Sequence, residues 1–381
     1  MDAVQSPVIP VVADLIGETP GTISLGQGVV CYGPPEAALR NVMAHRGDLG
    51  QFYSPVEGIP ELAGVLVRKL ADENRINIGT ERRVVVTAGA NMGFLNALFA
   101  ITDPGAEVIL PTPYYFNHEM AVRMLNCVPV CVPTDHRFQV DAGAIAAAMT
   151  ERTAAVVTIS PNNPSGAVYP EQSLRAVNAL CRERGAYHIS DEAYEYFVYG
   201  DQQHFSPAAI DTSLEHTISL FSLSKAYGFS SWRIGYMIIP AHLFENIRKV
   251  QDTNLICPPL ASQYAAIGAL QAGRGYCDAN IRQIVRNREF VLNELAKLRR
   301  ITGEVHSDGA LYAFPRLDTT LSDMQLVERL IREFRIATIP GSAFGMEDSC
   351  YLRVSYGALD ESTLEEGMHR LVGGLNAIFT E

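Results

Sequence analysis

The stretch RVVVTAGANMGFLNALFAI, residues 83–101, begins with β-branched residues and ends with an apolar segment of helical length, with Gly89 between them. It predicts a buried strand over 83–87, a tight turn, and a helix over 92–101. The alternation continues with predicted strands at 107–110, 154–159, 186–190, 217–221 and 234–239, and with a helix over 171–184. Apolar strands that alternate with helices predict an α/β domain whose mainly parallel sheet is covered on both faces.

The pattern changes after residue 240. Helices are predicted over 242–252, 260–272 and 278–298, followed by strands at 310–314 and 351–355 and helices at 324–334 and 361–375. This mixture predicts a smaller α+β domain. The first forty residues are rich in Pro and Gly and predict an arm that packs against other parts of the chain. We therefore expect an N-terminal arm with part of the small domain over 1–45, a large domain over 46–275, and a C-terminal small domain over 276–381.

Composition narrows the classes of function. The 381 residues carry a net charge of −12, which argues against broad nucleic-acid binding. The seven cysteines are scattered, and no second pair completes a zinc set with Cys127 and Cys131, so no metal site is expected. The first residues have no basic segment typical of a secretory signal, and no apolar run reaches the ~18 residues of a membrane span. A reducing cytoplasm fits this sequence best.

The run Ser222-Leu223-Ser224-Lys225-Ala226-Tyr227-Gly228 is followed by Arg233. A lysine amine condenses with aldehydes to form a Schiff base. Neighbouring hydroxyls and an arginine suit a phosphate. Pyridoxal 5'-phosphate (PLP) carries both an aldehyde and a phosphate, so the run indicates a PLP site. A surface lysine in a serine-rich loop is the competing interpretation.

Two further requirements of PLP are an acid for the pyridine nitrogen and a phosphate cup. Asp191 ends a predicted strand, where ligands of α/β sheets bind, although it also suits a helix N-cap. Gly89, Ala90 and Asn91 form a strand-to-helix turn, where the glycine permits close approach and helical N–H groups face an anion. Any tight strand-to-helix turn has this appearance.

Three more residues have both a structural and a functional interpretation. Tyr115 is either ordinary packing or a stacking platform under the ring. Asn163 lies in the turn Pro161-Asn162-Asn163-Pro164-Ser165-Gly166, where its amide can also bind the cofactor's phenolic oxygen or a substrate carboxylate. Arg353 is a charge within an apolar strand-like run, which suits either a substrate α-carboxylate or a structural salt bridge.

The order and spacing of these motifs resemble the class I/II aminotransferases of the fold-type I PLP-dependent enzymes, in the bacterial-type branch with aspartate, aromatic, alanine and kynurenine aminotransferases. The resemblance runs from about residue 23 to about residue 370. It rests on nine short matches: Leu25-Gly26-Gln27-Gly28, Tyr53 with Gly58-Ile59-Pro60-Glu61-Leu62, Gly89-Ala90-Asn91, Pro113-Tyr114-Tyr115, Asn162-Asn163-Pro164-Ser165-Gly166, Asp191-Glu192-Ala193-Tyr194, Ser222 to Lys225 with Arg233, Pro340-Gly341-Ser342-Ala343-Phe344-Gly345, and Arg353.

The resemblance implies a large domain with a seven-stranded sheet, a homodimer with shared active sites, and a role for each matched residue. Lys225 would form the Schiff base and move the proton, and Asp191 would pair with the pyridine nitrogen. Asn163 and Tyr194 would bind the phenolic oxygen, and Tyr115 would stack on the ring. The phosphate would be held by Gly89, Ala90, Asn91, Ser222, Ser224 and Arg233, with Tyr53 from the second subunit. Arg353 would bind the substrate carboxylate, helped by Asn163 and the backbone near Gly28.

The departures from the family's pattern concern the substrate. Related aspartate-specific enzymes have a lysine at the position of Asn91, and apolar Val29, Val30 and Cys31 replace a commonly polar stretch. We therefore expect a ping-pong aminotransferase for a neutral or aromatic L-amino acid and a 2-oxo acid. Another PLP carbanion reaction (C–S lyase, decarboxylase or amino-acid oxidase) is the alternative. A PLP-dependent transcription regulator would need a DNA-binding segment that this sequence lacks.

Overall fold

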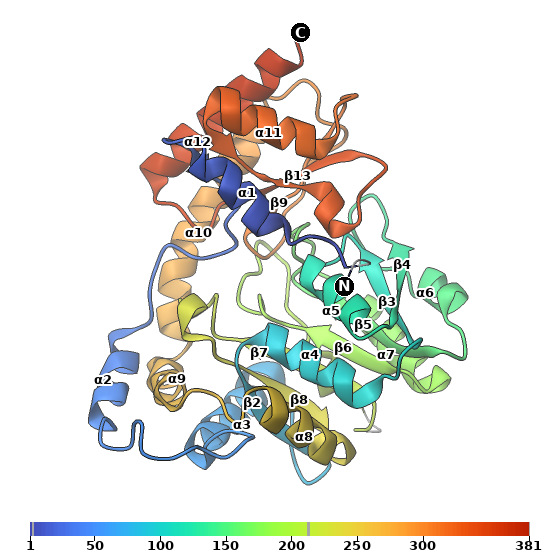
Figure 1. Cartoon of the computed structure of the whole chain (residues 1–381), viewed down its shortest axis with the longest axis vertical. Helices are drawn as coiled ribbons and strands as arrows, with labels where there is room; N and C mark the ends of the chain where they lie inside the picture. Colours follow the sequence, from blue (N-terminus) through green and yellow to red (C-terminus); the bar gives the residue numbers. More distant parts are fainter. Residues whose placement is uncertain (2–3, 212–213, 381) are drawn as a thin grey trace.

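The computed structural model describes residues 1, 4–211 and 214–380, and a seven-stranded sheet forms its centre (Figure 1). The strands lie in the order β2, β8, β7, β6, β5, β3, β4. β8 is antiparallel to both neighbours, and the other pairs are parallel. The mainly parallel sheet is therefore confirmed. The strands are β2 Arg82–Thr87, β3 Glu107–Thr112, β4 Val128–Pro133, β5 Thr153–Ile159, β6 Tyr187–Asp191, β7 Thr217–Ser222 and β8 Gly235–Pro240.

Successive residues of the strands point to opposite faces of the sheet, and helices cover both faces. Val157 belongs to the buried cluster on one face, whereas Val156 belongs to a cluster on the other. The first face is packed by α4 (Ala90–Ile101), α5 (Phe116–Met124) and α8 (Phe244–Asn254). The second is packed by α3 (Pro60–Asn74), α6 (Ala142–Ala148), α7 (Glu171–Arg184) and α9 (Leu260–Ala272).

The strand β4 was not predicted. Its sequence, VPVCVP, contains Pro129 and Pro133, which cannot donate hydrogen bonds to a neighbouring strand. β4 forms the edge of the sheet, pairs only with β3, and therefore tolerates both prolines. The same pairing carries β3 beyond Pro111 to Thr112, two residues further than expected.

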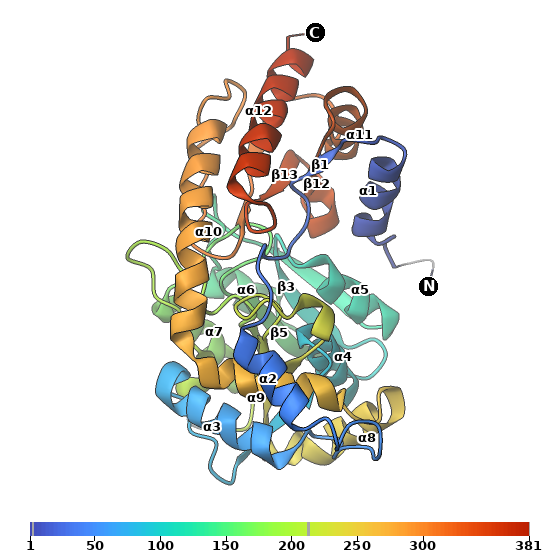
Figure 2. The same ribbon diagram turned by 90° about the vertical axis from the view of Figure 1, so that its left-hand side faces the viewer.

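A smaller unit lies beside the carboxyl ends of the parallel strands. Its antiparallel sheet joins β13 (Cys350–Ser355) to β9 (Tyr312–Ala313), β10 (Arg316–Leu317) and β12 (Ile339–Pro340). A separate parallel pair joins β1 (Ile23–Ser24) to β11 (Ile336–Ala337). Its helices are α11 (Asp323–Phe334), α12 (Glu361–Ile378) and α10 (Arg274–Leu295), which contacts both α9 and α12 (Figure 2).

The N-terminal segment contacts both units. α1 (Val8–Gly17) packs against α11 and β12, whereas α2 (Glu36–Ala44) packs against α9. The domain boundaries after residues 45 and 275 stay a prediction. Short 3-10 helices span Pro207–Ala209 (η1), Ser230–Trp232 (η2), Ala241–Leu243 (η3) and Gly341–Phe344 (η4). None of the helices in the described part of the chain combines the length and apolar character needed to cross a membrane.

Candidate active site

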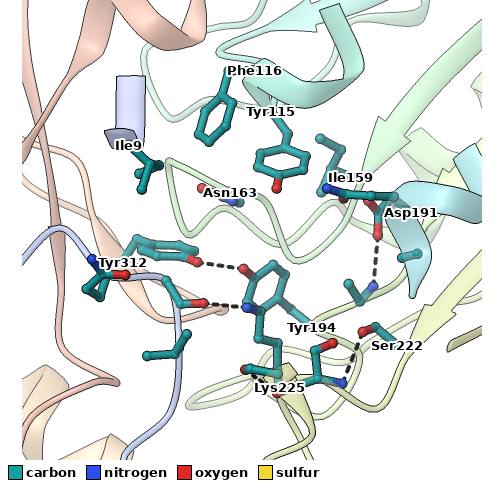
Figure 3. Close-up of a pocket in the computed structure, with 18 of the residues that line it drawn as sticks. Ile9, Tyr115, Phe116, Ile159, Asn163, Asp191, Tyr194, Ser222, Lys225 and Tyr312 are labelled. Carbon is teal, nitrogen blue, oxygen red and sulfur yellow. Dashed lines mark hydrogen bonds between the residues drawn. The ribbon is translucent and has the colours of Figure 1, made fainter. Parts of the chain in front are cut away.

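A cavity of about 310 Å³ opens at the carboxyl ends of β5, β6 and β7, between the large sheet and the smaller unit (Figure 3). This is the edge at which open α/β sheets bind ligands, because the parallel strands all deliver their last residues there. Twelve of the residues singled out in the sequence line it: Gly28, Ala90, Asn91, Tyr115, Asn163, Asp191, Tyr194, Ser222, Ser224, Lys225, Arg233 and Arg353.

Lys225 follows the end of β7 and extends into this cavity. Its Nζ donates a hydrogen bond to the backbone carbonyl of Gly28. Burial, together with the nearby charges of Arg353 and Arg233, lowers the pKa of Lys225 to about 8, and the charge of Asp191 opposes this shift. A lower pKa leaves more of the amine neutral near pH 7, and the neutral amine is the nucleophile.

Asp191 is the last residue of β6 and is only 6 % exposed. One carboxylate oxygen accepts a hydrogen bond from the backbone N–H of Ala193 at 3.0 Å. The other lies 3.3 Å from His118 Nε2, on α5. The hydrogen bond to Ala193 N–H, which an N-cap residue would make, therefore occupies only one carboxylate oxygen of Asp191. No helix begins at this position, so Asp191 is not a helix N-cap.

Sequence reasoning missed His118. Its ring is buried, stacks on Phe94 with centroids 3.9 Å apart, and meets Tyr115 edge-on at 5.3 Å. Tyr115 is the N-cap residue of α5, and His118 lies in its first turn, three positions later. Nothing in the sequence connects either residue to Asp191, which lies more than seventy positions away.

The start of α4 forms a cluster of hydrogen-bond donors with Arg233. Gly89 has φ +85, and a Cβ there would lie 2.4 Å from Arg233 Nη2, so this position needs glycine. Arg233 donates to Ser224 Oγ at 3.4 Å and to the carbonyl of Ser230 at 2.9 Å. Among the described residues Arg233 has no carboxylate partner. The cluster combines a helix N-terminus, hydroxyls and a free cation, which together suit a phosphate.

Arg353 reaches the cavity from β13 and is 2 % exposed. It donates to Asn163 Oδ1 at 2.9 Å and to the carbonyl of Gly26 at 2.7 Å, and its Nε is buried without a partner. No carboxylate in the part of the chain that the structure describes pairs with it, so a structural salt bridge does not explain its burial. A buried guanidinium without a counter-ion is suited to a substrate carboxylate.

Tyr194 and Tyr312 meet through their hydroxyls at 2.6 Å. Burial and the neighbouring Tyr312 hold the pKa of Tyr194 well above its usual range, so its hydroxyl stays protonated. Tyr312 was also missed, although it lies against two expected residues. A Cβ on Gly28 would come within 2.5 Å of the Tyr312 hydroxyl, and the guanidinium of Arg353 sits 4.5 Å above its ring.

Two other expectations, Tyr115 and Tyr53, concern the rim of the site. Tyr115 and Phe116 lie across the cavity from Lys225 (Figure 3), and Asn117 donates to the Tyr115 hydroxyl at 2.8 Å. Ile9 of α1 also lines the cavity and was not expected. Tyr53 does not line it: its side chain is 78 % exposed, beside Phe52, which is 83 % exposed.

Comparisons with known proteins support these observations. The profile of the family described as aminotransferase class I and II matches residues 20–371. The chain is 33 % identical over 377 residues to an aspartate aminotransferase of Pyrococcus abyssi, covering 97 % of this chain and 96 % of that protein. It is 34 % identical over 385 residues to an aromatic aminotransferase of Arabidopsis thaliana, covering 98 % and 94 %.

Solved structures agree over the same length. An aromatic aminotransferase from Pyrococcus horikoshii matches with a TM-score of 0.88 and 32 % identity, over 97 % of this chain and 99 % of that one. A single mutant of Thermus thermophilus aspartate aminotransferase matches with a TM-score of 0.90 and 30 % identity, over 98 % of both chains. The relatives therefore include both aspartate and aromatic aminotransferases.

Proposed function

The chain belongs to the class I and II aminotransferases, and on that premise we propose that its amino donor is a neutral or aromatic amino acid rather than aspartate. As a member of this family it is a PLP-dependent enzyme that exchanges an amino group between an amino acid and a 2-oxo acid. The fold-type I architecture of its relatives is the one described above.

One observation carries the proposal about the donor. The only cations among the described residues that line the cavity are Lys225, Arg233 and Arg353. Lys225 supplies the reactive amine, Arg233 would pair with the phosphate, and Arg353 would pair with the α-carboxylate. No cation remains for a second substrate carboxylate, and Val29, Ile9 and Phe116 add apolar wall. A carboxylate buried without a partner is costly, so the cavity favours an uncharged side chain.

The residues present fit PLP. The donors around Gly89, Ser224 and Arg233 suit its phosphate, with Ala90, Asn91 and Ser222 beside them. When bound, PLP supplies an aldehyde that condenses with amines and a ring that withdraws electrons from the substrate Cα. Tyr115 provides an aromatic face on the wall opposite Lys225.

Lys225 is the proposed nucleophile and proton carrier. Its lowered pKa lets Nζ accept a proton from the substrate Cα and return it in the next step. Asp191, held by Ala193 and His118, is the proposed anionic partner of a protonated ring nitrogen. A positioned carboxylate keeps that proton in place, because an opposite charge favours the charged form.

Asn163, Tyr194 and Arg353 are proposed to position the phenolic oxygen and the substrate. The Tyr194 hydroxyl stays protonated and can donate to an oxygen in the cavity. Arg353 would bind the α-carboxylate through its unpaired Nε and a charge that no carboxylate among the described residues neutralises, and Asn163 and the backbone near Gly28 lie beside it.

We also propose a homodimer in a reducing cytoplasm. The exposed Tyr53 and Phe52 lie on a loop that a second subunit would cover, which supports Tyr53 as a phosphate ligand given in trans. All seven cysteines carry free thiols, which is typical of a reducing compartment.

The test of this assignment uses the PLP-bound enzyme. Borohydride reduction followed by peptide mapping should place the pyridoxyl label on Lys225. Lys225→Ala should abolish turnover while the protein still folds and binds PLP non-covalently, whereas Lys297→Ala, on an exposed side chain, should leave activity unchanged. A label on any other lysine would refute the central assignment. A spectrophotometric screen of amino acids against the PLP form then identifies the donor.

A further inference from the structure

A second cavity, of about 490 Å³, lies away from the catalytic one and shares no lining residue with it. The loop 136–138, which follows β4 of the large sheet, forms one wall. Residues 302–306 and 314–316, together with Tyr351 of β13, form the other walls. The cavity therefore lies at the junction of the two units, a common place for ligand sites.

The floor of this second cavity is aromatic. Tyr351 and Phe314 stack with centroids 4.9 Å apart and an interplanar angle of 15°. Phe138 meets Phe314 at 5.8 Å and Tyr351 at 6.1 Å, edge-on in both cases. Tyr351 and Phe138 are only partly buried, so ring surface stays available in the cavity. An aromatic floor of this kind binds planar rings by stacking.

Phe138 is held in an unusual backbone conformation. Its φ is +59, which bulky residues rarely adopt. Asp135 fixes the turn: its carboxylate accepts from the backbone N–H of both Arg137 and Gln139 at 2.8 Å. Its carbonyl accepts from the Phe138 N–H at 2.9 Å. The turn therefore holds the Phe138 ring against the small unit. Such strain is often found at binding sites.

Cations surround the aromatic floor. Arg316 lies directly opposite Tyr351 in the antiparallel pair of β10 and β13, so both side chains share one face of the sheet. Among the described residues Arg316 has no carboxylate partner. Arg137 has only a distant one, Asp308 at 3.9 Å. His136 and His306 also line the cavity, and Glu304, the one acidic residue of the lining, lies 3.7 Å from His306 Nε2.

This concentration of positive groups stands on a chain with a net charge of −12. Elsewhere, exposed arginines of the chain commonly pair with carboxylates four residues away, as Arg175 does with Glu171 and Arg332 with Glu328. Arg316 has no such neighbour, and its guanidinium is free to bind an anion through two parallel hydrogen bonds.

We propose that this cavity binds a planar aromatic ring that carries one anionic group, either a carboxylate or a phosphate. The ring stacks on Tyr351 and meets Phe138 edge-on, and the anion pairs with Arg316 and Arg137. The ligand touches the large unit and the small unit at once. Phe314 also contacts Phe344, which contacts Phe116 of the catalytic cavity, and β13 carries both Tyr351 of this cavity and Arg353 of the other. The proposal does not depend on which amino acid is the donor.

The test is isothermal titration calorimetry of the PLP-bound enzyme with two probes, adenosine monophosphate for the phosphate and 2-naphthoate for the carboxylate. At least one probe should bind at one equivalent per subunit. Arg316→Glu should weaken that binding by at least about tenfold, because it reverses the charge next to the ring. Arg316→Gln should weaken it less. Arg299→Glu, at an exposed arginine outside the cavity, is the matched control and should leave it unchanged.

Three results would overturn the proposal. The first is no binding of either probe below about 1 mM. The second is binding that Arg316→Glu leaves intact. The third is 2-naphthoate binding that Arg353→Lys removes and Arg316→Glu does not, because the carboxylate would then occupy the catalytic cavity. Unchanged transaminase turnover in Arg316→Glu verifies that the variant is folded.

Discussion

Leucine and aspartate differ at Cγ only in whether two methyl groups or two carboxylate oxygens branch from it, so the pair isolates the effect of charge on the donor. In the proposed binding mode the donor side chain would meet Val29, Ile9 and Phe116, and the cations Lys225, Arg233 and Arg353 would already be engaged. A buried charge without a partner costs about 3–5 kcal/mol. The cavity is partly open, so the lower end of that range applies.

At about 1.4 kcal/mol per factor of ten, the cost corresponds to a preference of about 100-fold for leucine over aspartate. The assay is kcat/KM for each donor with one saturating 2-oxo acid as common acceptor. Asn91 lines the cavity, at the position where the family resemblance implies a lysine in aspartate-specific enzymes. Asn91→Lys should therefore raise kcat/KM for aspartate at least about tenfold, and Asn91→Met, of similar length without charge, should not. An enzyme that uses aspartate as well as leucine would refute the reasoning.

Three further predictions concern the cofactor. Asp191→Asn should lower kcat by several orders of magnitude with modest loss of PLP, and a rate within about tenfold of wild type, ~1.4 kcal/mol of barrier, would reduce Asp191 to a capping residue. Gly89→Ala should weaken PLP binding, measured by equilibrium dialysis, because its Cβ would lie 2.4 Å from Arg233; Gly105→Ala, with φ +88 and open space, carries the same backbone strain and should retain the cofactor. When PLP is added back to the enzyme stripped of it, the rate at which PLP attaches to Lys225 should rise with pH with a midpoint near 8. The reason is that the pKa of Lys225 is lowered to about 8 and only the neutral amine attacks. A rate that keeps rising to the pKa of an ordinary lysine, about 10.4, would contradict this.

The sequence by itself determined the fold class and most of the catalytic cavity. The apolar strand patterns and the glycine turns are local features of the sequence. Parallel strands place their carboxyl ends at one edge of a sheet, so these patterns also indicate the edge at which a ligand site is expected. Asp191 ends such a strand and Lys225 follows one, whereas Arg233 precedes the antiparallel β8, so all three could be placed at this edge from local signals. The edge strand β4 was not predicted, because prolines are tolerated in a strand only where it lacks a neighbouring strand on one side. The position of a strand in the sheet cannot be read from its local sequence.

Only the tertiary structure decided which distant side chains touch. His118 reaches Asp191 because α5 packs beside α4 and β4 on one face of the large sheet, and Tyr312 reaches Tyr194 because the small unit places β9 at the cavity. The second cavity has the same origin: Phe138 and Tyr351 come from separate units and meet where those units join. These contacts span tens to hundreds of residues, and hydrophobic periodicity, which repeats every two or about four residues, carries no information about such distances.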